Sequence, residues 1–193
     1  MSLLSKFRPA PSPPMDLDPE KTGRTWLITG ATNGIGRELA RMVAAPGRRM
    51  ILPARSLERA EELASELRES GAEVDIVKLN LAHLSSVHEA AAAVRALGTD
   101  IDVMVNNAGA VTGRRVLTDD GFERILATNF LAPFAFTNLL ADLVTGRIVI
   151  TGSHSHKKGH VDIGDPHFEH RKWSFPVAYS QSKLADQMWA TAL

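Results

Sequence analysis

The chain alternates short apolar runs with longer segments of helical periodicity. The strand-length runs lie at 25–29, 49–54, 73–79, 101–105 and 147–151. Such alternation is typical of parallel strands joined by crossover helices, which then cover both faces of the sheet. The sequence therefore predicts a single α/β domain built on a doubly wound parallel sheet.

Three of the intervening segments, 56–71, 83–97 and 118–143, are predicted to be helices. In the first, Ser56 is a plausible N-cap and Gly71 stands where a left-handed residue ends a helix. Its predicted buried stripe consists of Leu57, Ala60, Ala64 and Leu67. Pro53 is expected at the end of the second strand, because proline removes a hydrogen-bond donor from the sheet.

The N-terminal segment differs from the rest in composition. Five of the ten prolines lie between Pro9 and Pro19, so we expect residues 1–22 to be a leader and 23–193 to form the domain. The 193 residues include no cysteine, which excludes a disulfide scaffold. The formal net charge is zero, so nucleic acid is not an expected partner. With neither a signal peptide nor a membrane-length apolar run apparent, we expect a cytoplasmic protein without a membrane span.

A glycine-rich turn, TGATNGIG at 29–36, directly follows the first predicted strand and precedes a helical segment. Glycines let the backbone approach a pyrophosphate, and the helix start provides free amides and a favourable dipole. We interpret the turn as part of a dinucleotide site, the alternative being a plain tight connection. The predicted contacts are Gly30, Thr32, Asn33, Gly34, Ile35 and Gly36.

Arg55 follows the second predicted strand, about 20 residues after the glycines, at the position that reads the cofactor's ribose. An acidic residue there suits an unmodified ribose, whereas a cation suits a 2′-phosphate. Arg55 therefore favours NADP(H) over NAD(H). The alternative interpretation is a surface arginine at a helix start.

Three motifs together resemble the short-chain dehydrogenase/reductase family: TGxxxGxG at 29–36, NNAG at 106–109 and YxxxK at 179–183. The resemblance implies a Rossmann-type fold. The long interval between Ser153 and Tyr179 is similar to that in the branch of retinol-dehydrogenase-like and protochlorophyllide-reductase-like enzymes, which implies NADP(H). Family members continue beyond YxxxK with further strands and a substrate lid, which this sequence lacks, so the domain is expected to be truncated within the YxxxK helix.

The resemblance also assigns candidate site residues. Those matching the family's catalytic tetrad are Asn129, Ser153, Tyr179 and Lys183. Further expected cofactor contacts are Asn80, Leu81, Asn107, Ala108, Gly109, Tyr179 and Lys183. Asn80 replaces an aspartate that the family places beside the adenine.

Tyr179 and Lys183 lie four residues apart on a predicted helix, so their side chains project from one face. Tyrosine ordinarily ionises near pH ~10, and a neighbouring ammonium favours the phenolate. Tyr179 is then the expected general acid for carbonyl reduction and general base for alcohol oxidation. Ser153 would stabilise the charge that develops on the substrate oxygen.

The resemblance thus predicts an NADP(H)-dependent oxidoreductase that acts on a small-molecule aldehyde, ketone or alcohol. The alternative is a cofactor-binding sensor or scaffold without turnover. We also expect a homo-oligomer, through a helix seam formed by Val177, Leu184, Met188, Trp189 and Ala192.

Histidines gather in one segment, where five of the seven lie. They are His154, His156, His160, His167 and His170. Their irregular spacing lacks a metal-ligand pattern, so no metal site is predicted and a substrate-side loop is the favoured interpretation.

Overall fold

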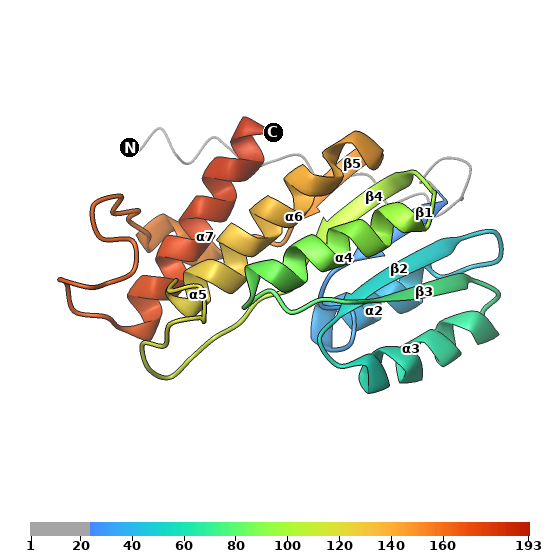
Figure 1. Cartoon of the computed structure of the whole chain (residues 1–193), viewed down its shortest axis with the longest axis horizontal. Helices are drawn as coiled ribbons and strands as arrows, with labels where there is room; N and C mark the ends of the chain where they lie inside the picture. Colours follow the sequence, from blue (N-terminus) through green and yellow to red (C-terminus); the bar gives the residue numbers. More distant parts are fainter. Residues whose placement is uncertain (1–23) are drawn as a thin grey trace, which may run out of the picture.

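The computed structural model describes residues 24–193, so the predicted leader at 1–22 lies outside the described residues. Five parallel strands form one sheet in the order β3-β2-β1-β4-β5 (Figure 1). The strands are β1 (Thr25–Ile28), β2 (Arg49–Ala54), β3 (Glu73–Lys78), β4 (Ile101–Asn106) and β5 (Val144–Ile150). This confirms the predicted doubly wound α/β sheet.

Helices connect the successive strands, and α7 follows the last strand. They are α2 (Gly34–Val43), α3 (Leu57–Glu69), α4 (Leu84–Ala96), α5 (Arg124–Leu126), α6 (Ala132–Leu140) and α7 (Phe175–Ala192). A π-helical segment, η2 (Ala127–Leu131), joins α5 to α6, and two 3-10 turns are η3 (Ala141–Leu143) and η4 (His154–Lys158). The long α7 carries Tyr179 and Lys183.

The core has two halves because successive strand residues point to opposite faces of the sheet. Leu27 and Ile51 lie in one cluster with residues of α4 and α6. Trp26, Ile28 and Met50 lie in the other cluster with residues of α2 and α3. Both faces are therefore covered, which explains why the strands read as continuous apolar runs.

Two predicted element boundaries and one predicted buried residue were wrong. The helix predicted over 118–143 begins only at Arg124, because the preceding residues form a turn closed by a bridge between Leu117 and Glu123. Leu57 is exposed, and Leu63 takes its place in the buried stripe of α3. Strand β5 starts at Val144 and includes an irregularity opposite β4.

Pro53 is the penultimate residue of β2 and lies in register with Val77 of β3.

Trp189, predicted for an intermolecular seam, is instead buried, and its ring packs edge-on against Phe130 and Phe134.

The helical run Arg124–Leu143 has the length and apolar composition of a membrane-crossing helix. The sequence prediction that no such run exists is therefore wrong. Half of its apolar window is buried inside the structure, where Phe136 and Leu140 belong to the core cluster. That burial fits the core helix of a globular domain.

Candidate active site

The glycine turn between β1 and α2 packs directly against the turn that follows β4. Gly30 has a φ of +68°, and a Cβ there would lie 2.8 Å from the Ala108 Cα. A Cβ on Gly36 would lie 2.4 Å from Asn107 Nδ2 and 2.5 Å from the Gly30 carbonyl oxygen. Only glycine fits either position, so the motif spacing follows from the close approach of two backbone segments.

Thr29 and Asn107 fasten these turns together. The Thr29 hydroxyl accepts hydrogen bonds from the backbone amides of Asn107 and Ala108, both at 3.1 Å. Asn107 Nδ2 donates to the Thr29 carbonyl oxygen at 3.1 Å. The sequence motif includes Thr29. Its role in joining the two turns could not be predicted, because the turns follow strands that are distant in the chain.

A cavity of about 520 Å³ opens over the carboxyl ends of the strands, within the size range of small-molecule sites. The predicted cofactor contacts that line it are Gly30, Thr32, Asn33, Gly34, Ile35, Arg55, Asn80, Leu81, Asn107, Ala108, Gly109, Tyr179 and Lys183. Gly36 is buried beneath the turn rather than lining the cavity. The cavity thus joins the glycine turn to the YxxxK helix across the sheet.

Arg55 and Arg59 line the cavity beyond the end of β2. Both side chains are exposed, and Ser56 between them accepts a hydrogen bond from the Arg59 amide at 3.4 Å, which confirms the predicted N-cap of α3. The sequence prediction did not include Arg59. Two guanidinium groups at this end of the cavity suit a phosphate-bearing ligand.

Asn80 has a second, structural role. Its side-chain oxygen accepts the backbone amide of Ala82 at 3.2 Å, so a turn already uses one lone pair of the oxygen predicted to meet an adenine. An amide oxygen has two lone pairs, which leaves one for a ligand.

Asn129 lies in the π-helical segment η2 and is almost fully buried. Its side-chain oxygen accepts the amide of Ala110 at 2.7 Å, and its nitrogen donates to the Ser182 hydroxyl at 3.1 Å. Asn129 itself does not line the cavity, whereas its neighbour Thr128 does. Single π turns are frequent at functional sites, and this one ties the β4 turn to α7.

Lys183 is buried on α7, with its Nζ 6.0 Å from the centroid of the Tyr179 ring. The ammonium donates to the carbonyl oxygen of Thr151 and to Asp186 Oδ2, both at 2.9 Å. The Tyr179 ring is half-buried against Phe175, with 5.6 Å between the ring centroids. Tyr179 and Lys183 therefore share one face of α7, as predicted.

Ser153 lies just after β5 and is half-buried. Its hydroxyl oxygen accepts the amide of Ser155 at 3.2 Å, which leaves the hydroxyl hydrogen free to rotate toward a ligand. Ser153 does not line the cavity, although the preceding Thr151 and Gly152 do. Of the four predicted tetrad residues, the cavity thus includes Tyr179 and Lys183 directly.

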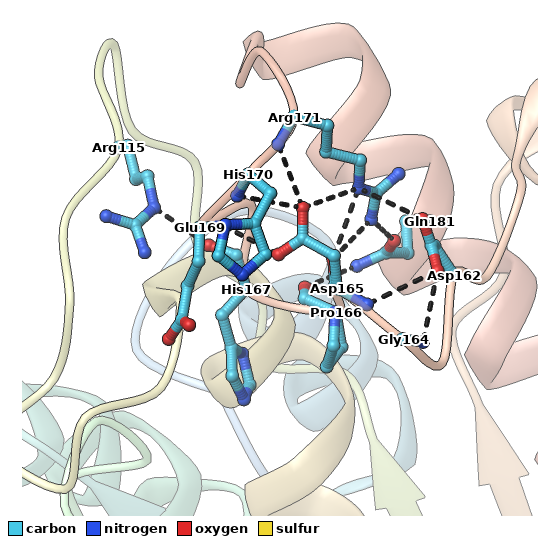
Figure 2. A network of polar contacts seen from close by, with 10 residues as sticks. All are labelled: Arg115, Asp162, Gly164, Asp165, Pro166, His167, Glu169, His170, Arg171 and Gln181. Carbon is cyan, nitrogen blue, oxygen red and sulfur yellow. Dashed lines mark hydrogen bonds and ion pairs between the residues drawn. The ribbon is translucent and has the colours of Figure 1, made fainter.

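The segment between η4 and α7 is anchored by a polar network around Asp165 (Figure 2). The Asp165 carboxylate accepts the backbone amides of Glu169, His170 and Arg171 at 2.6, 3.2 and 3.0 Å. The Arg171 guanidinium donates to Gln181 on α7. Phe168 within this segment has a φ of 56°, strained for a bulky residue, and packs with Ile125 and Ala178 beside Tyr179. The segment is therefore held beside Tyr179.

The histidines of this region serve separate contacts. His156 Nδ1 lies 2.6 Å from the Ser153 carbonyl oxygen, and His167 Nδ1 accepts the Glu123 amide at 3.3 Å. Within residues 24–193, no group of three or more potential ligands has the geometry of a metal site.

The family model for short chain dehydrogenases matches residues 24–164. The chain belongs to this family. Mouse polyprenol dehydrogenase is 38% identical over 99% of the chain, and human retinol dehydrogenase 13 is 37% identical over 84% of it. These relatives support the retinol-dehydrogenase-like branch of the short-chain dehydrogenases.

Among solved structures, an alcohol dehydrogenase from Thermococcus sibiricus, complexed with 5-hydroxy-NADP, is 28% identical with a TM-score of 0.69. It aligns with 88% of this chain and 69% of its own. The chain spans 58% of the length of the mouse relative and 51% of the human one. The chain is thus shorter than these short-chain dehydrogenases and has the family fold.

Proposed function

We propose that the protein is an NADP(H)-dependent oxidoreductase that interconverts a carbonyl and an alcohol with Tyr179 as the general acid and base. The observation that carries this proposal is the continuous cavity, which joins the glycine turn and Arg55 to Tyr179 and Lys183. A cavity that has a glycine turn at one end and a Tyr–Lys pair at the other suits a dinucleotide better than a small substrate alone.

The residues present fit such a cofactor. The glycine turn leaves no room for a Cβ at Gly30, and its amides precede α2, which suits a pyrophosphate. Arg55 and Arg59 would hold a 2′-phosphate, which supports NADP(H) over NAD(H). The related alcohol dehydrogenase complexed with 5-hydroxy-NADP points in the same direction.

The protein's part in the reaction is to position groups and to move one proton. The nicotinamide, when bound, supplies or takes the hydride. Tyr179 would donate its hydroxyl proton to the carbonyl oxygen in reduction and accept it in oxidation. Ser153 would donate a hydrogen bond to the same oxygen, and the Lys183 ammonium would stabilise the phenolate.

The substrate class follows from the surroundings of Tyr179. Phe175 stacks beside its ring, and Trp173 and Phe168 pack in the adjacent cluster. Apolar side chains beside the proposed general acid would favour a lipophilic aldehyde, ketone or alcohol. The names of the polyprenol and retinol dehydrogenase relatives support this class.

Replacing Tyr179 with phenylalanine tests the proposed role. We expect Tyr179→Phe to abolish turnover in a screen of lipophilic aldehydes and ketones, because phenylalanine keeps the ring but has no proton to transfer. NADPH affinity, measured by nicotinamide fluorescence, should remain nearly unchanged. Turnover retained by the variant would rule out the proposed mechanism.

A further inference from the structure

A buried carboxylate lies behind the ammonium of Lys183. Asp186 is 2% exposed, and its Oδ2 accepts a hydrogen bond from Lys183 Nζ at 2.9 Å. Its other oxygen, Oδ1, is buried and has no hydrogen-bond partner among residues 24–193. A buried carboxylate that lacks half of its hydrogen bonds is costly to keep, so a purely packing role is a poor explanation.

The position of Asp186 relative to Tyr179 is set by the helix. The three residues lie at i, i+4 and i+7 of α7, so they share one face in the order Tyr179, Lys183, Asp186. Lys183 Nζ lies 6.0 Å from the centroid of the Tyr179 ring, whereas Asp186 lies roughly 10 Å from Tyr179 along the helix axis. The Asp186 carboxylate is therefore farther from Tyr179 than the Lys183 ammonium is.

We propose that Asp186 is a positioning residue that fixes the Lys183 ammonium and offsets part of its charge, and thereby sets the pH at which Tyr179 gives up its proton. This inference rests on the proposed function for its catalytic meaning. The Lys183 ammonium has three hydrogens, and it donates two of them to Asp186 and to the Thr151 carbonyl. These two hydrogen bonds fix the direction of the third hydrogen.

Two opposing influences act on the Asp186 carboxylate, and burial is the larger of them. Burial raises the pKa of the Asp186 carboxyl, and the Lys183 ammonium opposes that rise. The neutral carbonyl of Thr151, just after β5, contacts Lys183. The 3-10 turn η4 packs against α7 and carries the titratable side chains of His154, His156, Lys157 and Lys158.

The chain offers a direct readout, because Tyr179 is its single tyrosine. Ionisation of that hydroxyl can be followed by tyrosinate absorbance in the near ultraviolet, without any turnover. In Asp186→Asn, which keeps the shape and one acceptor oxygen but removes the charge, we expect the ionisation midpoint to fall by about one pH unit. Tyr179→Phe should abolish the signal and so assign it.

Controls separate a charge effect from a loss of structure. Asp142→Asn removes a carboxylate that pairs with Arg95 on the surface and should leave the midpoint unchanged. If Asp186→Asn does not fold by circular dichroism, Asp186→Ser provides a second charge-free variant with the same expected direction.

Two results would overturn the proposal. An unmoved midpoint would leave Asp186 with a structural role alone. A midpoint that rises would mean that the carboxylate chiefly keeps Lys183 protonated rather than offsetting its charge. Because the titration needs neither cofactor nor substrate, failure of the proposed oxidoreductase function would appear separately, in cofactor binding and turnover.

Discussion

Single side chains hold together the segments that surround the cavity. Thr29 links the first and fourth strands, Asn129 links η2 to the β4 turn and α7, and Asp165 gathers three consecutive amides of its loop. Each of these side chains accepts hydrogen bonds from backbone amides of another turn or of its own loop. The site is therefore shaped by a few polar residues whose loss should have local and measurable effects.

Asp165 provides a prediction about pH. Desolvation favours a higher pKa for its carboxyl, but the amides of Glu169, Arg171 and His170, together with the Arg171 charge, lower that pKa below its usual value. A lowered folded-state pKa means that the stabilisation is present above the unfolded-state value and is lost as the pH falls through the folded-state value. The wild-type free energy of unfolding should therefore decline in acid.

We expect Asp165→Asn to lower the melting temperature at neutral pH and to flatten this acid dependence, because an amide cannot carry the charge. Thermal unfolding monitored by circular dichroism across the acid range measures both. Asp100→Asn, at an exposed position, is the control and should behave like the wild type. An acid dependence unchanged in Asp165→Asn would contradict the assigned role.

The chemistry-bearing residues were accessible to sequence reasoning to different degrees. Tyr179 and Lys183 were predicted because a motif fixes their spacing on one helix. Asp186 was missed, although it lies only three residues further on, because its importance depends on burial. Ser182 and Thr151 were missed because their partners come from distant segments, which spacing along the chain does not reveal.

At the scale of elements, the decisive feature is the contact between the β1–α2 turn and the turn after β4. The sequence motif predicted this glycine turn and its place before a helix. It did not predict the π-helical segment η2 inside the helix expected over 118–143, because one extra residue in a π turn barely disturbs apolar periodicity. That segment nevertheless positions Asn129 between two other elements.

Gly36→Ala should disturb this contact. The new methyl group would lie 2.4 Å from Asn107 Nδ2 and 2.5 Å from the Gly30 carbonyl oxygen, which forces the two turns apart. We expect a loss of about 1–3 kcal/mol in the free energy of unfolding, and weaker NADPH binding. Denaturant unfolding and fluorescence titration measure these effects.

Gly113→Ala is the matched control, since a Cβ there meets nothing within 4 Å. It should leave both quantities close to the wild-type values. Equal behaviour of the two variants would mean that the turns do not constrain each other as the structure indicates.

At the scale of the whole molecule, apolar side chains remain exposed on α6 and α7. Phe134, Val177 and Met188 are 43%, 46% and 57% exposed. The alternation of strands and helices predicted the layered fold. The sequence could not distinguish the exposed Val177 and Met188 from the buried Trp189, because all three follow the same helical period. We expect the exposed side chains to contribute to self-association.

Met188→Lys should shift sedimentation toward the smaller species, since a charge at such a contact is costly to bury. Gln187→Lys changes the neighbouring exposed residue in the same way and serves as the control. A wild-type chain that sediments as a monomer over the accessible concentrations would contradict the expected homo-oligomer.

The central claim is that this chain binds NADP(H) across the cavity between Arg55 and Lys183. Titration of the wild-type chain with NADPH and NADH, followed by nicotinamide fluorescence, tests it most directly, with Arg55→Ala compared against Arg68→Ala on the far part of α3. We predict saturable binding of NADPH and weaker binding of NADH. The ratio of the two affinities should fall by roughly tenfold or more in Arg55→Ala and should not change in Arg68→Ala. Absence of saturable binding, or NADH binding as tight as NADPH in the wild type, would contradict the account.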